Sequence, residues 1–138
     1  MISGTVNTDK SISDYIPQRP PFVFIDTVEA LDAALARTRF TVVSDCVLVT
    51  DGALPLSGLM ENAAQTCAVR AGYAGGNKIG FIGAVKQMEV THIQHVGETL
   101  TTEAKLIQEV LNISLVECTT RVNDEVIATA TLKLAIIE

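Results

Sequence analysis

The chain has 138 residues, 48% of them hydrophobic, and a formal net charge of −6 at pH 7. This size predicts a single domain, residues 1–138, that begins with a polar segment at 1–14. Without a basic cluster, an acidic chain is not expected to bind nucleic acid, because phosphates need concentrated Lys and Arg. No apolar run approaches the roughly 20 residues of a membrane span, and MISGTVNTDK lacks the order of a secretory signal, so we expect a cytoplasmic protein outside the membrane.

The N-terminal part of the chain predicts a turn followed by strands. Residues 11–14 can cap a short helical turn. A stiff, proline-rich segment at 17–21 leads into a strand predicted at 22–26. Residues 28–35 fit either a helix or continued strands with a turn, and we take the strands. The next strand is predicted at 36–43.

One long helix is predicted at residues 55–72, after a turn at Asp51-Gly52. At about 100° per residue, Glu61 and Gln65 fall just past one border of its apolar face. That face is built mostly from small residues: Leu59, Met60, Ala63, Ala64, Cys67, Ala68 and Ala71. Such a face lets a sheet close tightly around the helix. A carboxylate at its margin is neither central in the core nor free in water, so Glu61 is the first candidate for chemistry.

The C-terminal half predicts antiparallel strands joined by tight turns at Leu111-Asn112 and Asn123-Asp124. The strands are expected at 79–90, 99–110, 113–122 and 126–137. The whole order predicts an α+β fold, in which a curved antiparallel sheet of about five or six strands wraps around one central helix.

The cysteines indicate neither a zinc site nor a disulfide framework. Cys46, Cys67 and Cys118 are far apart and lack CxxC spacing, so we expect small apolar core residues in a reducing compartment. No metal and no cofactor is predicted. The high apolar content of so short a chain favours a surface covered by a second copy.

Three motifs follow one another along the chain: IPQRPPFVFIDTV at 16–28, MENAAQ at 60–65 and HVGE at 95–98. They resemble the PHRxPFLLVDRV opening, the EAMAQ helix and the PGD turn of the 3-hydroxyacyl-[acyl carrier protein] dehydratases, which have the hotdog fold. GALP at 52–55 resembles the short segment before the helix in the dehydratases of aryl-polyene clusters. The resemblance covers the chain from about Tyr15 to the end.

The resemblance implies a homodimer with an acyl-thioester tunnel at its interface. The thioester would be carried on acyl carrier protein or on coenzyme A. In that family a histidine and an acidic residue perform the dehydration, and the acid and its neighbouring amide correspond to Glu61 and Gln65, which are therefore predicted to be catalytic. The histidine of the opening motif is replaced by Gln18, which cannot act as a base because an amide does not titrate in water. The predicted substrate-binding residues are Gln18, Pro55, Gly58, Asn62, Phe81 and His95.

Three functions stay open at this point. The first is a dehydratase-like lyase of fatty acid or polyene biosynthesis with Glu61 as acid or base. The second is a thioesterase in which Glu61 activates water. The third is a degenerate subunit that binds acyl chains or forms a heteromer with an active paralogue.

Individual residues also have plainer interpretations. Glu61 fits a solvated acid in the first helical turn, favoured by the helix dipole. His95 fits a surface histidine in a turn. Arg70, Lys78 and Lys86 could guide a phosphopantetheine arm or be ordinary solvated cations.

Overall fold

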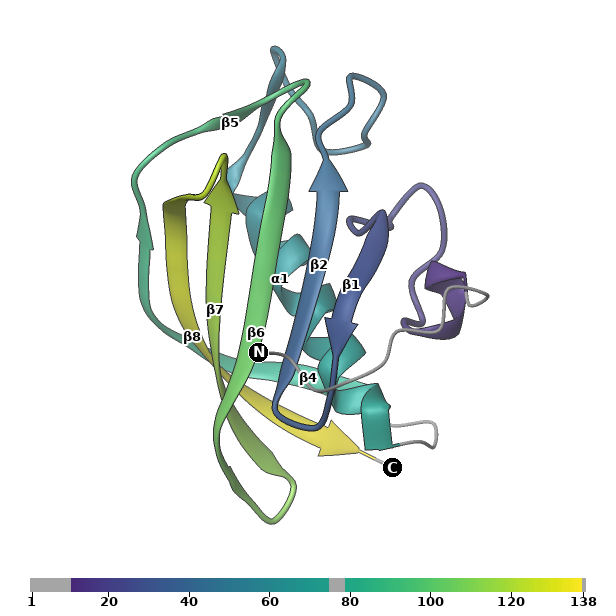
Figure 1. The fold of residues 1–138 in the computed structure, drawn as a ribbon, viewed down its shortest axis with the longest axis vertical. Helices are drawn as coiled ribbons and strands as arrows, with labels where there is room; N and C mark the ends of the chain where they lie inside the picture. Colours follow the sequence, from purple (N-terminus) through teal and green to yellow (C-terminus); the bar gives the residue numbers. More distant parts are fainter. Residues whose placement is uncertain (1–10, 75–78, 138) are drawn as a thin grey trace.

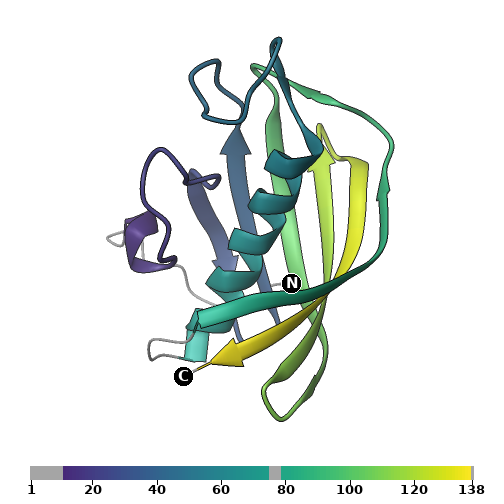
Figure 2. The same cartoon turned by 180° about the vertical axis from the view of Figure 1, so that it is seen from behind.

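One helix lies against one face of a curved antiparallel sheet in the computed structural model, which describes residues 11–74 and 79–137 (Figure 1). Figure 2 shows the helix, α1 (Leu56–Ala71), in front of the sheet. The sheet order is β1 (Thr27–Leu31), β2 (Leu35–Thr41), β6 (Thr99–Val110), β7 (Ile113–Val122), β8 (Glu125–Ile137) and β4 (Ile79–Val90). A two-stranded sheet pairs β3 (Ala53–Leu54) with β5 (Gln94–His95), and the 3₁₀ turns are η1 (Ile12–Asp14) and η2 (Gly72–Ala74). Within the described residues, no helix is long and apolar enough to cross a membrane.

The predicted helix, the long C-terminal strands and the strand interpretation of residues 28–35 are confirmed. The strand predicted at 22–26 is wrong, because β1 begins only at Thr27. Residues 22–24 are instead bound by side-chain amides of α1, whose polar atoms take the place of a neighbouring strand. Asp26 then ends this segment by accepting a hydrogen bond from Thr41 N at 2.7 Å.

Two tight turns form where the sequence predicted them. Asp51 and Gly52 both have positive φ, 53° and 76°, and Thr50 exchanges two backbone hydrogen bonds with Ala53 across them. Asn123 and Asp124, with φ of 51° and 66°, join β7 to β8. Positive φ at both central residues matches the twist of antiparallel strands, which explains the Asn, Asp and Gly in these turns.

The small face of α1 packs directly on the sheet. Ala63 and Cys67 share a buried cluster with Ala104, Cys118 and Ala130 of the facing strands. The small face of the helix thus meets small residues of the sheet, as the sequence predicted, and Val116, Leu132 and Leu134 complete the cluster. A second buried cluster contains Phe24 and Phe40, whose rings pack edge to face with their centroids 5.7 Å apart.

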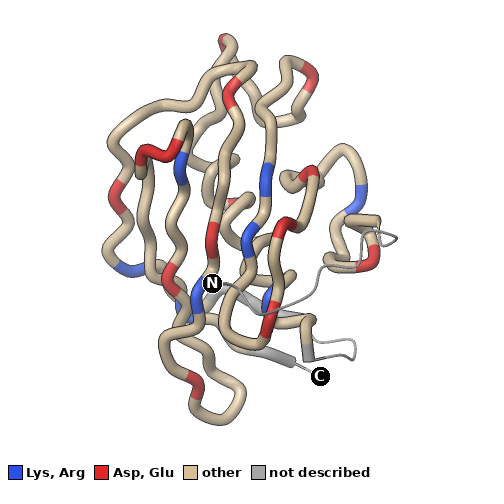
Figure 3. Tube along the Cα trace, viewed as in Figure 1, with Lys and Arg blue, Asp and Glu red and all other residues tan. Residues whose placement is uncertain are grey.

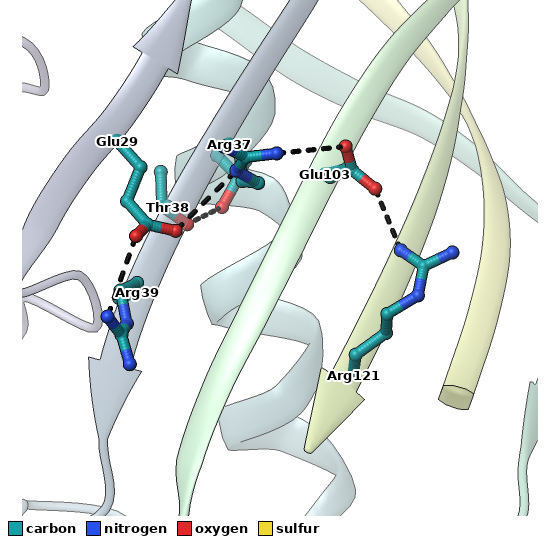
Figure 4. A network of polar contacts seen from close by, with 7 residues as sticks. Glu29, Arg37, Thr38, Arg39, Glu103 and Arg121 are labelled. Carbon is teal, nitrogen blue, oxygen red and sulfur yellow. Dashed lines mark hydrogen bonds and ion pairs between the residues drawn. The ribbon is translucent and has the colours of Figure 1, made fainter. Parts of the chain in front are cut away.

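The outer face of the sheet carries a chain of ion pairs (Figure 4). Glu29 lies 3.5 Å from Arg37 and 3.6 Å from Arg39, while Glu103 binds Arg121 at 2.7 Å and reaches Arg37 at 4.0 Å. In Figure 3 the loops at the upper end of the molecule carry acidic segments, whereas several basic segments lie on strands. Three arginines of this acidic chain, Arg37, Arg39 and Arg121, are therefore paired with carboxylates on the sheet.

Glu103→Gln is expected to lower the free energy of unfolding by no more than about 1 kcal/mol, because half-exposed ion pairs are screened by water. The loss should shrink in 1 M NaCl. Urea unfolding at low and high salt measures both effects. Glu117→Gln is the matched control, since Glu117 is exposed on neighbouring β7 and has no ion pair in the described part of the chain. An equal loss in the control would contradict this interpretation.

Two thiols meet inside the core. Cys67 Sγ lies 3.4 Å from Cys118 Sγ, and both cysteines are free and buried. The hydrogen bond to Cys118 and then burial raise the pKa of Cys67 well above its ordinary value of 9.0. The folded chain therefore keeps this proton at a pH where the unfolded chain releases it.

This pKa shift predicts that the contribution of Cys67 to stability is complete below about pH 9 and is lost as the pH rises further. Unfolding measured from pH 7 to pH 10 should show a steeper loss for the wild type than for Cys67→Ala, which has no thiol at this position. Parallel slopes in the two proteins would contradict the prediction.

Candidate functional site

Glu61 lies in the second turn of α1, where it is half-buried. Its placement in the first turn is wrong, because the helix begins at Leu56 and its first turn holds no acid. Glu61 Oε1 accepts a hydrogen bond from Gln65 Nε2 at 3.0 Å. Among the described residues Oε2 has no partner, so one carboxylate oxygen is held and the other can reach substrate or water.

Gln65 holds that carboxylate from a fully enclosed position. The sequence placed it at the margin of the apolar face, but its exposed fraction is 0%. Its Oε1 accepts a hydrogen bond from Phe24 N at 2.8 Å, and its Nε2 donates to Phe22 O at 2.9 Å. The backbone donor and acceptor fix which end of the amide is oxygen and which is nitrogen, so the nitrogen must face Glu61.

Asn62 is enclosed in the same way. Its exposed fraction is 0%, its Nδ2 donates to Phe24 O at 2.7 Å, and its Oδ1 accepts from Thr102 Oγ1 at 2.7 Å. With both ends of the amide engaged, this side chain offers no surface to a substrate in the chain as described. The geometry therefore gives the prediction of substrate binding no support at Asn62.

Pro55 and Gly58 shape the start of α1. Pro55 precedes the first helical residue, and its carbonyl accepts hydrogen bonds from Gly58 N and Leu59 N at 2.9 and 3.2 Å. A Cβ atom on Gly58 would lie 2.3 Å from Leu54 Cδ1, so any other residue here would require the buried Leu54 side chain to move.

Gln18 and His95 are the other predicted site residues with described side chains. Gln18 is half-buried, and its Oε1 is enclosed without a hydrogen-bond partner in the described part of the chain. His95 is exposed; its backbone pairs with Ala53 just before α1, and its Nδ1 lies 3.5 Å from Glu98 Oε1. Phe81 pairs with Ala135 in the β4–β8 ladder, and its side chain lies outside the described ones.

The cations named as possible guides for a phosphate are not grouped. Arg70 is 5% exposed and donates to Ala33 O at 2.9 Å, so its suggested role at the surface is wrong. Lys86 is exposed on β4, and Lys78 lies outside the described residues.

The structure thus brings Glu61, Asn62 and Gln65 together on one helix, against a segment that the sequence assigned to a strand. Sequence reasoning missed the backbone groups of Phe22 and Phe24. It also missed the buried threonines between helix and sheet: Thr66 on α1 and Thr38, Thr102 and Thr120 on the strands beneath it. Polar residues at inward positions of strands were the available signal for three of them.

Family comparison decides the classification. The sequence profile of the ApeP-like family, described as ApeP dehydratase, matches residues 10–136. The chain belongs to the ApeP-like dehydratase family. A search of the curated proteins finds no match.

Solved structures of this family and of others share the fold. The dehydratase heterocomplex ApeI:P from Xenorhabdus doucetiae matches with a TM-score of 0.84 and 19% identity, covering 94% of this chain and 92% of that one. PaaI of Escherichia coli, from the phenylacetic acid degradation operon, gives 0.68 and 16%, covering 78% and 80%. A hypothetical thioesterase with coenzyme A from Streptococcus pneumoniae gives 0.69 and 11%, covering 80% and 84%. The expected hotdog fold is confirmed.

Gln65→Glu is expected to lower the free energy of unfolding by about 2 kcal/mol or more, because Phe22 O loses a buried donor. The loss should be larger at pH 7.5 than at pH 5, since the introduced carboxylate is charged beside Glu61 at the higher pH. Chemical denaturation at the two pH values tests this.

Gln65→Met is the control for that experiment, because it removes the hydrogen bonds without adding charge. Its loss of stability should be equal at the two pH values. A pH-dependent loss in Gln65→Met would show that the difference does not come from the two carboxylates.

Proposed function

We propose that this protein is a 3-hydroxyacyl-thioester dehydratase-type lyase in which Glu61 is the acid and base. The observation that carries the proposal is the half-buried carboxylate, which is held at Oε1 by Gln65 and has no partner at Oε2 among the described residues. Membership of a dehydratase family supports the reaction class. Substrates on acyl carrier protein or on coenzyme A both fit this proposal.

In the proposed reaction Glu61 transfers one proton. Oε2 removes the proton from C2 of the 3-hydroxyacyl thioester and returns it to the C3 hydroxyl, which leaves as water while the C2=C3 double bond forms. Gln65 keeps the carboxylate in one orientation throughout, so no reorganisation of this group accompanies the reaction.

The remaining residues of the site bind substrate in this proposal. Gln18 Oε1, which has no hydrogen-bond partner in the described part of the chain, accepts from a donor on the substrate, such as an amide of the pantetheine arm. Pro55, Gly58 and Phe81 border the acyl chain, and His95 lies near its entrance.

A second chain completes the site. β4 forms one edge of the sheet and exposes Val85 and Val90, so it can pair with another subunit. The partner is a second copy or a paralogue, and the similarity to a chain of a dehydratase heterocomplex supports the latter.

A thioesterase is the second candidate. Within the described residues Glu61 contacts no histidine, and a carboxylate with one free oxygen can activate water alone. The fold is shared with a hypothetical thioesterase that holds coenzyme A.

The deciding measurement is mass-spectrometric turnover of crotonyl and longer 2-enoyl thioesters in the hydration direction. Glu61→Gln and Glu61→Ala should each lower hydration by about 100- to 10,000-fold, the usual contribution of a general acid or base. Glu117→Gln, an acid on the outer face of the sheet, should leave it unchanged.

Other outcomes assign the other functions. Release of free acid without hydration would identify a thioesterase. No turnover by the protein alone, with turnover restored when a paralogue is co-expressed, would identify a partner subunit and would contradict catalysis by this chain on its own.

A further inference from the structure

Three buried threonines form a row across the inner face of the sheet, beneath α1. Thr38, Thr102 and Thr120 are cross-strand partners on β2, β6 and β7, and their exposed fractions are 0%, 0% and 3%. Burying a hydroxyl is unfavourable unless it is hydrogen-bonded. The three hydroxyls therefore need hydrogen-bond partners within the core, and the donor and acceptor of each hydrogen bond can be assigned.

The direction follows from counting hydrogens. Thr102 Oγ1 donates its only hydrogen to Asn62 Oδ1 at 2.7 Å. In the 3.0 Å contact between Thr102 and Thr120, the donor must then be Thr120. Asn62 extends this series of hydrogen bonds, because its Nδ2 donates to Phe24 O at 2.7 Å.

The series of hydrogen bonds continues to the carboxylate of Glu61. Phe24 N donates to Gln65 Oε1 at 2.8 Å, and Gln65 Nε2 donates to Glu61 Oε1 at 3.0 Å. The carbonyl and the amide of Phe24 belong to successive peptide units, so the two hydrogen bonds at this residue are linked only through the position of its backbone. The hydrogen bond from Asn62 to Phe24 O fixes that position, and therefore fixes where Phe24 N donates to Gln65. Every donor from β7 to Glu61 points toward the carboxylate.

We infer that Thr102 and Thr120 are positioning residues for Glu61, acting through Asn62, Phe24 and Gln65. Their effect on turnover rests on the proposed function, whereas their effect on the hydrogen bonds of Gln65 does not. Where the resembling EAMAQ motif has alanine, this chain has Asn62, which links the sheet to the site.

A second branch of the same row provides a matched control. Thr66 Oγ1 donates to Asn62 O at 2.8 Å, so Thr38 must be the donor in its 2.8 Å contact with Thr66. This branch ends on a carbonyl of the helix backbone and does not lead to Glu61. Thr38 and Thr102 are equally buried and directly opposite each other, so Thr→Val at either removes one buried hydroxyl. The variant at 102 breaks two side-chain hydrogen bonds and the variant at 38 breaks one, so Thr102→Val is expected to cost more stability.

The test compares Thr102→Val with Thr38→Val by NMR of the ¹⁵N-labelled full chain. In Thr102→Val the proton resonances of Gln65 Nε2 and Phe24 N should move upfield, because weaker hydrogen bonds deshield these protons less. In Thr38→Val they should stay at the wild-type positions. Thr102→Ser, which keeps the hydroxyl, should restore them.

Thr120→Val is the second variant, needed if Thr102→Val does not fold. It should move the same resonances in the same direction by a smaller amount, because Thr102 still donates to Asn62. Wild-type resonances in the folded variant, or equal displacement in Thr38→Val, would overturn the inference and leave the row a purely structural feature.

Kinetics separate this inference from the proposed function. Given hydration activity in the wild type, Thr102→Val should lower kcat about tenfold with little change in KM, since a misplaced catalytic group slows the chemical step. Absence of activity in the wild type, together with the expected NMR result, would remove the proposed function and leave the positioning chain standing. Equal kcat in Thr102→Val and the wild type would overturn the catalytic part of the inference.

Discussion

Two side-chain amides, those of Asn62 and Gln65, hold residues 22–24 where a neighbouring strand would otherwise be required. Together they bind Phe22 O, Phe24 N and Phe24 O at distances of 2.7 to 2.9 Å. Buried backbone groups need partners, and here the helix provides them. Because Gln65 also binds Glu61, the contact that closes the fold on this side fixes the candidate catalytic group.

Polar side chains lie in the middle of this core, and burying them costs little stability because nearly all of them are hydrogen-bonded. The threonine row, Asn62 and Gln65 use their hydroxyls and amides within one network. A network of this kind stabilises a unique arrangement when every member is satisfied, and is costly when one member is lost. The site is therefore rigid on the side of the sheet. In the described part of the chain, Glu61 Oε2 and the enclosed Gln18 Oε1 have no hydrogen-bond partner.

Much of the fold could be predicted from local patterns. Alternation in the last strands, the two-residue turns at 51–52 and 123–124 and the small face of the helix all specify short-range geometry, and the structure has each of them. The segment 22–26 failed because its apolar residues have the composition of a strand, while its partners are 38 to 43 residues away on a helix. Composition carries no information about such distant partners. For the same reason the enclosure of Gln65 could not be foreseen: helical periodicity places it at a margin, and only the docked segment covers it.

The complete engagement of Gln65 limits how this scaffold can change its chemistry during evolution. Both amide hydrogens and the amide oxygen are used, and no other side chain presents the same three groups at this length. Substitution at 65 would disturb the fold before it altered a reaction. Divergence of activity is thus directed to neighbouring positions such as 18, where glutamine already stands in place of the histidine of the resembling motif and the fold is intact.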